Sequence, residues 1–134
     1  MDQDTILALF RRSGALLEGH FQLSSGLHSP GYLQCALVLQ HPQEASLLGA
    51  EIAARVSQLK PEIVVSPALG GVVIGQEVAR RLNTRAIFVE RRDGAMALRR
   101  GFKLQRGERV LVVEDVVTTG RSTRETIEVV RGAG

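Results

Sequence analysis

Apolar residues follow two different periods along this chain, and the two periods alternate. Spacings of three and four residues, which place apolar side chains on one face of a helix, occur in four stretches. The first is a helix with Asp4 as its N-cap and apolar residues from Ile6 to Leu17, whose end is left open because Gly14 interrupts it. The others are a second from Pro42 to the residues before Pro61, a third through Ile74, Val78 and Leu82, and a last one from about Ser122 through Ile127 and Val130.

Short runs of β-branched and other apolar residues lie between these stretches and predict strands. The runs are Tyr32–Leu39, Ile63–Val65, Ala86–Val89 and Val110–Val113. Strands that alternate with helices in this way predict βαβ units, with right-handed crossovers and a parallel β-sheet flanked by helices. We therefore expect an α/β fold that forms one domain over residues 1–134, with an N-terminal part of about 1–40 and a core of about 41–134.

Two segments that contain glycine separate these elements and are expected to be loops. Ser66–Gly71 directly follows the Ile63–Val65 run, at the carboxyl end of an expected strand. Glu90–Arg109 is polar and basic and contains three glycines, which is typical of a long mobile loop or an extended hairpin rather than a packed element.

Composition is that of an ordinary globular protein and serves mainly to exclude other classes. Apolar residues make up 44% and charged residues 23%, and no apolar run is long enough to span a bilayer. The polar, acidic start Met1–Asp4 is unlike a secretory signal. The single cysteine, Cys35, gives no disulfide framework, and the three histidines lack the close spacing of a zinc site. We expect a cytoplasmic protein with no membrane partner and no resident metal centre.

Positive charge is concentrated in one segment. Between Arg80 and Arg109, ten Lys and Arg residues stand against three acidic ones, a local balance of +7, whereas the whole chain carries +3. Such clustering attracts anions, although a solvated arginine-rich surface is the simplest interpretation of any charged run. Nucleic acid is not expected as a partner, because no Trp, one Tyr and four Phe leave few rings on which bases can stack. A small polyanionic ligand fits better.

Two adjacent carboxylates mark the chemically richest segment, Leu111–Thr123. An apolar strand carries Glu114 and Asp115 at its carboxyl end, and a loop of hydroxyl residues and glycine then leads into a helix. In open α/β sheets, ligands bind beyond the carboxyl ends of the strands. We therefore expect a binding site at this position.

The loop after the carboxylates has the features of a phosphate-binding loop. A helix N-terminus presents free backbone N–H groups and the positive end of its dipole, which attract a phosphate. Gly120 lets the backbone approach the ligand closely. Thr119, Ser122 and Thr123 offer further hydroxyl donors.

The two carboxylates would repel a phosphate, so they are expected to face another part of the ligand. Ionised carboxylates only accept hydrogen bonds, which suits the 2- and 3-hydroxyls of a ribose. A pair of acids beside a phosphate-binding loop therefore predicts a ribose 5-phosphate site. The alternative is a core strand followed by a helix that Ser122 or Thr119 caps. Two acids at the end of an apolar strand, followed by several hydroxyl residues, favour the ligand site.

Val110–Thr123 resembles the phosphoribosylpyrophosphate-binding motif of the type I phosphoribosyltransferases. It lacks the pattern of a P-loop, and Gly70–Gly75 does not form a dinucleotide-binding fingerprint. The resemblance implies that Glu114 and Asp115 hold the ribose hydroxyls and take part in catalysis, and that the following residues wrap the 5-phosphate. Those residues are Val116, Val117, Thr118, Thr119, Gly120, Arg121 and Ser122.

Two further segments resemble the orotate phosphoribosyltransferases within that family, and their order along the chain agrees as well. Phe21–Tyr32 is similar to the N-terminal segment that forms a hood over the base in those enzymes. Ser66–Gly71 is similar to their pyrophosphate-binding loop.

The resemblance to orotate phosphoribosyltransferases implies contacts with the base and the pyrophosphate. Tyr32 and Leu33 would line the orotate pocket, and Thr118 would hydrogen-bond the base. Further substrate contacts fall on Ser24, Leu69 and Gly70. From the residues alone, Tyr32 could equally belong to the core, and the residues around Ser24 could form a plain turn.

The basic segment supplies cations for the pyrophosphate, as the resemblance implies. Arg99 and Arg100 are expected to act in catalysis, and Arg91, Arg92 and Lys103 to bind substrate. In the family such loops act across a dimer interface, so the expected assembly is a homodimer that shares its mobile loops. The expected cofactor is Mg²⁺, bound mainly through the pyrophosphate of the substrate.

The chain departs from the best-known family pattern at several positions. Many members have lysine where Ser24 and Gly70 stand, and arginine where Glu90 stands. Members also continue beyond the equivalent of Gly134, with added strands and an arginine that grips the orotate carboxylate. Either the chain is shortened at its C-terminus or its binding of the base is incomplete, and we expect it to hold the pentose phosphate but to turn over poorly.

The reaction that this resemblance implies joins orotate to the 5-phosphoribosyl group of 5-phosphoribosyl-1-pyrophosphate. Its products are orotidine 5-monophosphate and pyrophosphate, a step of pyrimidine biosynthesis. Two alternatives remain open. A purine phosphoribosyltransferase would keep the phosphate-binding loop but replace the hood. A non-catalytic regulator would sense phosphoribosylpyrophosphate and would normally carry a nucleic-acid-binding module.

Overall fold

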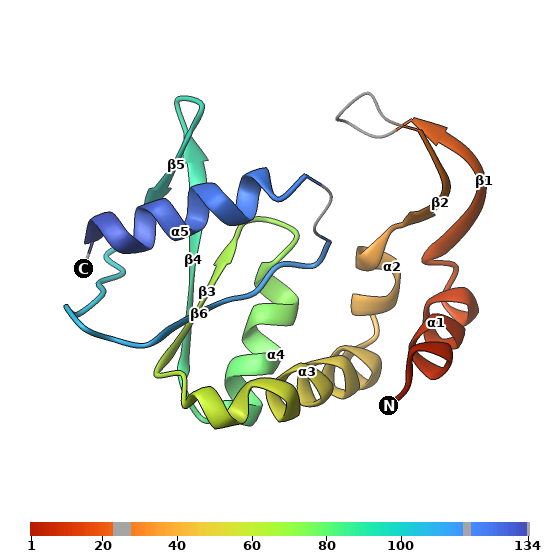
Figure 1. The fold of residues 1–134 in the computed structure, drawn as a ribbon, viewed down its shortest axis with the longest axis horizontal. Helices are drawn as coiled ribbons and strands as arrows, with labels where there is room; N and C mark the ends of the chain where they lie inside the picture. The colour runs from red at the N-terminus through yellow and green to blue at the C-terminus, as the bar shows by residue number, and fades with distance from the viewer. Residues whose placement is uncertain (23–27, 117–118, 134) are drawn as a thin grey trace. The chain divides into compact units, whose positions relative to one another are not determined.

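The computed structural model of the protein describes residues 1–22, 28–116 and 119–133, and for residues 17–22 and 28–33 it describes the backbone alone. Its elements are shown in chain order in Figure 1. The chain folds into two compact units, Met1–Ala45 and Ser46–Gly134.

The first unit contains two helices and a pair of antiparallel strands. Its elements are α1 (Gln3–Arg12), β1 (Leu16–Gln22), β2 (His28–Leu33), α2 (Cys35–Leu39) and the first residues of α3 (Pro42–Val56). β1 and β2 pair with Leu16 opposite Leu33. The expected helix start at Pro42 is confirmed, which agrees with the preference of proline for the first turn.

Local chemistry corrects the expected bounds of the first helix. Asp2, not Asp4, is the N-cap, because its carboxylate accepts a hydrogen bond from the backbone N–H of Thr5 at 2.8 Å. The helix ends at Arg12, and Gly14 then adopts a φ of +76°, a left-handed conformation that stops a helix. Leu17 therefore lies in β1 and not on the helix face.

The run Tyr32–Leu39 was predicted as one strand, and this is wrong. β2 ends at Leu33, and Cys35–Leu39 forms α2. Within α2 the buried residues are Cys35, Val38 and Leu39, which are spaced by three and four and so share one helical face. A short apolar run fits both periods, and here burial selects the helical one.

The second unit contains a four-stranded sheet in the order β5-β4-β3-β6. The strands are β3 (Ile63–Pro67), β4 (Arg85–Arg92), β5 (Ala95–Leu98) and β6 (Val110–Val112). β3 pairs in parallel with both β4 and β6, while β5 pairs antiparallel with β4. The expected parallel sheet flanked by helices is confirmed, with one antiparallel strand added at its edge.

Helices cover both faces of the central strand β3. α4 (Val72–Leu82) contacts β3 and β4, and α5 (Arg121–Ala133) contacts β3, β5 and β6. Ile63 and Val65 belong to the core cluster against which Val130 of α5 packs. The alternate residues of β3, which include Ser66, lie on the side of α4. Burial on both faces explains why the central strand is an uninterrupted apolar run.

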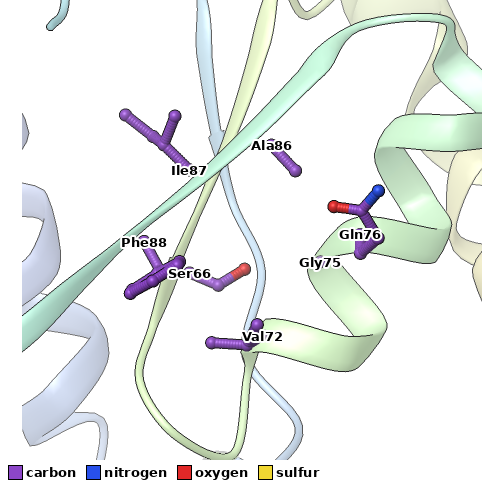
Figure 2. A pocket seen from close by; sticks show the side chains of 7 residues that line it. All are labelled: Ser66, Val72, Gly75, Gln76, Ala86, Ile87 and Phe88. Carbon is purple, nitrogen blue, oxygen red and sulfur yellow. The ribbon is translucent and has the colours of Figure 1, made fainter. Parts of the chain in front are cut away.

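α4 lies very close to the sheet at one point. Figure 2 shows a small hollow there, where the hydroxyl of Ser66 points toward α4 at Gly75. The Ser66 hydroxyl oxygen is buried and has no hydrogen-bond partner among the described residues. A Cβ at position 75 would collide with it, so this contact between helix and strand requires glycine.

The basic segment Glu90–Arg109 packs on the sheet, and its first part, as far as Leu98, forms a hairpin. Its first residues complete β4, and a turn at Asp93 and Gly94, both with positive φ, leads into β5. The hairpin alternative is confirmed, but the expectation that the segment would not pack is wrong. Four of its apolar side chains lie against the core cluster. They are Met96, Leu98, Phe102 and Leu104.

The second predicted helix ends earlier than expected. α3 stops at Val56, and a 3-10 turn at Ser57–Leu59 follows it. Over the part of the chain that is described, no helix combines the length and the apolar character that a membrane crossing requires.

The contact between α3 and α4 gives a test of this packing. A Cβ on Gly49 of α3 would lie 2.7 Å from the Cβ and 2.8 Å from the carbonyl carbon of Glu77 in α4. Alanine normally stabilises a helix by about 1 kcal/mol over glycine, but overpacking a fixed contact costs roughly 1–3 kcal/mol. We expect Gly49→Ala to lower the free energy of unfolding by about 1–2 kcal/mol, as measured by urea denaturation.

Gly132→Ala is the matched control, since Gly132 lies in α5 with no other atom within 4 Å of the new methyl group. It should be neutral or slightly stabilising. A Gly49→Ala variant that is more stable than the parent would show that α3 and α4 do not approach so closely.

Candidate active site

Two loops meet at the carboxyl ends of the neighbouring parallel strands β3 and β6. The loop after β3, residues 68–71, leads into α4. Residues 113–116 follow β6, and residues 119–120 precede α5. A Cβ on Gly70 would lie 2.7 Å from Oδ2 and 2.9 Å from Oδ1 of Asp115, so the two loops are in direct contact. This is the sheet edge at which open α/β folds bind ligands.

The contact depends on glycine at two successive positions. A side chain at position 70, such as the lysine of the family pattern, would have to displace the Asp115 carboxylate. A Cβ on Gly71 would lie 2.9 Å from the carbonyl oxygen of Pro67 and 3.1 Å from that of Val113. The absence of side chains therefore lets the first loop lie against the second.

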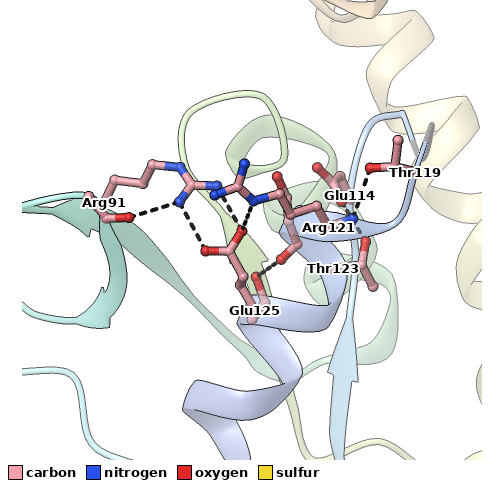
Figure 3. A network of polar contacts seen from close by, with 9 residues as sticks. Arg91, Glu114, Thr119, Arg121, Thr123 and Glu125 are labelled. Atoms are coloured by element: carbon pink, nitrogen blue, oxygen red, sulfur yellow. Dashed lines mark hydrogen bonds and ion pairs between the residues drawn. The ribbon is translucent and has the colours of Figure 1, made fainter. Parts of the chain in front are cut away.

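The two acids predicted to bind ribose are brought to this edge and are each held by a neighbour. Both are partly buried. Asp115 Oδ1 accepts a hydrogen bond from the backbone N–H of Val116 at 2.9 Å. Glu114 Oε2 accepts one from the hydroxyl of Thr123 at 2.5 Å. Thr123, which was expected to offer its hydroxyl to a phosphate, here donates it to Glu114 (Figure 3).

The N-terminus of α5 follows the acids directly. Gly120 has a φ of +80°, a conformation that favours glycine, and α5 begins at the next residue. Thr119 Oγ1 accepts a hydrogen bond from the backbone N–H of Arg121 at 3.3 Å, so this side chain caps the helix. Val117 and Thr118, which were also predicted to bind the ligand, lie outside the described residues.

The two arginines that were predicted to act in catalysis are both paired with Glu90. Arg99 Nη1 lies 3.1 Å from Glu90 Oε1, and Arg100 Nε lies 2.6 Å from Oε2. The Arg100 guanidinium also lies over the ring of Phe88, 5.6 Å from its centroid. The hydrogen bond from Arg100 holds the pKa of the Glu90 carboxyl below its usual value. The carboxylate at position 90 therefore fixes the two cations at the base of the hairpin.

The remaining predicted cations divide into one that reaches α5 and two that are exposed. Arg91 makes a two-fold hydrogen bond to Glu125 of α5, with N···O distances of 3.0 and 2.9 Å. Arg92 and Lys103 are exposed. Glu125 was not predicted, although its spacing of four residues from Arg121 is a signal that sequence reasoning can use.

The predicted base-binding residues are not tested by this geometry. Ser24 lies outside the described residues, and Tyr32 and Leu33 belong to β2, where only the backbone is described. Leu69, in the loop after β3, has 85% of its surface exposed. These assignments stay predictions.

Glu114 and Asp115 are ligands of the kind that usually hold a magnesium ion at phosphate sites. No group of three or more His, Cys, Asp and Glu side chains suited to a metal ion occurs in residues 1–22, 28–116 and 119–133. Mg²⁺ commonly takes one or two carboxylates and completes its shell with substrate phosphates and water. Glu114 and Asp115 provide that donor set.

The fold and the paired acids before a helix N-terminus define the class of protein as a phosphoribosyl transferase domain, and the family model of that description matches residues 38–134. The chain belongs to the orotate phosphoribosyltransferase family, as the sequence led us to expect. It is 54% identical over 134 residues to the orotate phosphoribosyltransferase of Pelotomaculum thermopropionicum, covering 100% of this chain and 70% of the relative.

A second relative and a solved structure agree with this family. The orotate phosphoribosyltransferase of Novosphingobium aromaticivorans is 58% identical over 137 residues, covering 100% of this chain and 71% of the relative. The crystal structure of orotate phosphoribosyltransferase from Aeropyrum pernix superposes with a TM-score of 0.74 at 29% identity, covering 96% of this chain and 75% of that chain.

The contact between Gly70 and Asp115 can be tested with a double-mutant cycle. We expect Gly70→Ala to lower kcat/KM for orotate phosphoribosyl transfer by about tenfold or more, because the new methyl group must displace the carboxylate. If the effect acts through Asp115, then Gly70→Ala combined with Asp115→Asn should be no slower than Asp115→Asn alone. Losses that multiply in the double variant would contradict the contact.

Proposed function

We propose that this chain transfers the 5-phosphoribosyl group from 5-phosphoribosyl-1-pyrophosphate to orotate, which yields orotidine 5-monophosphate and pyrophosphate. The observation that supports this most is the contact between Gly70 and Asp115, because it joins the paired acids to the loop after β3 at one sheet edge. Sequence similarity to orotate phosphoribosyltransferases over the whole chain supports the choice of acceptor.

Glu114 and Asp115 would accept hydrogen bonds from the two ribose hydroxyls. Ionised carboxylates have no proton to donate, and a vicinal diol offers two hydrogen-bond donors. The hydrogen bonds from Thr123 and Val116 hold these carboxylates in place before the substrate arrives. Preorganisation of this kind reduces the cost of ordering the site on binding.

The first turn of α5 would bind the 5-phosphate. Free N–H groups and the helix dipole favour an anion at that position, and Gly120 leaves the backbone accessible. Ser122 and Thr119 would add hydroxyl donors, and Val116, Val117, Thr118 and Arg121 would complete the loop around the phosphate. Charge-assisted hydrogen bonds there contribute roughly 1.5–3 kcal/mol each.

The reaction would be a direct displacement at the anomeric carbon of the ribose. The bond from that carbon to the pyrophosphate oxygen breaks with its electron pair leaving on pyrophosphate. A ring nitrogen of orotate forms the new bond, and its proton passes to the departing pyrophosphate or to solvent. Positive charge develops on the ribose ring, and the nearby carboxylates of Glu114 and Asp115 stabilise it. The contribution of the chain is therefore positioning and electrostatics rather than covalent catalysis.

Mg²⁺ is the expected cofactor, held by the substrate pyrophosphate with Glu114 and Asp115 as the protein donors that fit it. When bound, it would neutralise negative charge on the departing pyrophosphate.

The hairpin arginines would provide further positive charge for the pyrophosphate. Arg99 and Arg100 would act directly, and Arg91, Arg92 and Lys103 would assist binding. Gly70 and Leu69, in the loop after β3, would approach the same group through the backbone. In a homodimer, the mobile hairpin would be shared across the interface, with Arg99 and Arg100 reaching the site of the partner subunit. Closure over the ligand would exclude water, which otherwise competes with orotate for the ribosyl cation.

The base is assigned on the resemblance of the N-terminal segment to that of orotate phosphoribosyltransferases. Ser24, Tyr32, Leu33 and Thr118 are the residues proposed to contact orotate or its surroundings. A panel of labelled reactions with orotate, adenine, guanine and hypoxanthine distinguishes this proposal from a purine enzyme. Binding of phosphoribosylpyrophosphate without release of pyrophosphate in any of them would indicate a regulator. We further propose a cytoplasmic location.

Removal of one carboxylate charge tests the ribose assignment. We expect Asp115→Asn to lower kcat/KM for phosphoribosylpyrophosphate by about tenfold or more, which is about 1.4 kcal/mol of transition-state stabilisation. The assay measures pyrophosphate release with orotate. Asp4→Asn, an exposed residue of α1, is the control and should behave like the parent. Unchanged kinetics in Asp115→Asn would exclude the ribose role.

The shared hairpin can be tested by mixing subunits. Arg99→Ala with Arg100→Ala should inactivate the hairpin, and Asp115→Asn should inactivate the ribose site. If the hairpin acts across the interface, then verified heterodimers of the two variants should recover activity at one of their two sites. Heterodimers without recovery would show that each hairpin serves its own subunit.

A further inference from the structure

Three charged side chains form a cluster between the hairpin and the start of α5. Arg91 Nη2 lies 2.9 Å from Glu125 Oε1, and Arg121 Nε lies 3.2 Å from the same oxygen. Arg91 belongs to β4, whereas Arg121 and Glu125 stand one turn apart on α5. Figure 3 shows the two guanidinium groups next to each other, above the carboxylate that they share.

The geometry of Arg91 is more tightly defined than that of an ordinary surface ion pair. Its two terminal nitrogens bind the two oxygens of Glu125, at 3.0 and 2.9 Å. Nη1 also lies within 3.4 Å of the Gly94 carbonyl oxygen in the hairpin turn. A two-fold pairing fixes both the distance and the plane of the guanidinium. Arg91 is thereby held by two elements, the hairpin and α5.

The cluster has one positive charge in excess, because a single carboxylate is shared between two arginines. Two guanidinium groups repel each other, so holding them together is unfavourable unless an anion lies beside them. Glu125 supplies only half of the compensating charge. The remaining positive charge lies at the N-terminus of α5, one residue beyond Gly120 and beside Thr123, which orients Glu114.

Stability does not account well for this arrangement. The side chains of Arg91 and Arg121 are 40% and 73% exposed, and exposed ion pairs contribute little to folding. The cluster instead gives a defined position to the guanidinium of Arg91, which is one of the predicted substrate-binding residues.

We propose that Glu125 is a positioning residue, which holds Arg91 and Arg121 side by side so that they receive the pyrophosphate group of the substrate together. The proposal rests on the function proposed above. Glu125 itself touches no substrate and acts through the two arginines. A different role for the same contact is competition, in which Glu125 occupies Arg91 until the pyrophosphate displaces it.

The two roles predict opposite effects of removing the Glu125 charge. Glu125→Gln makes the site more positive, so by electrostatics alone an anion should bind more tightly. If Glu125 positions the arginines, binding should weaken in spite of the added positive charge. We expect the KM for phosphoribosylpyrophosphate to rise about tenfold or more in Glu125→Gln, with a smaller change in kcat. A KM that falls or stays the same overturns the proposal.

Two further variants separate position from charge. Glu125→Asp keeps the charge but withdraws the carboxylate from Arg91, so it should show much of the same rise in KM. Arg91→Lys keeps the positive charge but loses the two-fold pairing, and it should add little to the effect of Glu125→Gln in the double variant. A Glu125→Asp variant with the parent KM, or losses that multiply in the double variant, would contradict a positioning role.

Glu62→Gln is the matched control. Glu62 precedes β3, at the opposite end of that strand from the site, and pairs with Arg109 at 3.5 Å. Its replacement removes a surface Glu–Arg pair away from the site and should leave the KM unchanged. Circular dichroism melts of every variant verify that the fold is retained. If Glu125→Gln does not fold, Glu125→Asp and Arg91→Lys still decide the question.

Calorimetric titration with inorganic pyrophosphate keeps this inference separate from the proposed function. The parent chain should bind pyrophosphate, and Glu125→Gln should bind it about tenfold more weakly. If the parent releases no pyrophosphate with orotate, the proposed function fails, but the titration still decides the role of Glu125. Equal binding by the parent and Glu125→Gln, or no binding by the parent, overturns the inference whatever the activity.

Discussion

The close approach of Gly70 to the Asp115 carboxylate is the constraint on which the site depends. It brings together the loops that follow β3 and β6. With glycine at position 70 the carboxylate keeps this place, whereas a Cβ there would have to displace it. This geometry also means that position 70 contributes no cation. Positive charge for a pyrophosphate must therefore come from another element.

That charge lies on the β4–β5 hairpin, where acidic residues of the same chain hold the arginines. Glu90 binds Arg99 and Arg100, and Glu125 binds Arg91. An exposed arginine is a flexible chain that loses entropy when a ligand fixes it. Carboxylates that fix the side chain in advance reduce that loss. The chain thus combines a segment of high positive charge with a small number of acids that determine where the charge is placed.

Sequence patterns predicted the elements whose burial is simple. β3 is covered on both faces and forms an uninterrupted apolar run, and α4 carries one apolar face at helical spacing. The apolar pattern gave a wrong prediction where one run of residues fits both the helical and the strand period. The run Tyr32–Leu39 is divided between β2 and α2. β5 is short and lies in a polar segment, so its apolar residues form no recognisable strand pattern. Long-range pairing decides such segments, and a local window does not contain that information.

For the site, the sequence by itself determined the chemistry, and the tertiary structure decided the partners. Two acids, a glycine and hydroxyl residues in one continuous segment predict a ribose 5-phosphate site, because a strand, loop and helix place neighbouring residues together. The contacts of Gly70 with Asp115 and of Arg91 with Glu125 join residues 45 and 34 positions apart. Only the pairing of β3 with β4 and β6, and the packing of α5 beside the hairpin, bring those residues within contact distance.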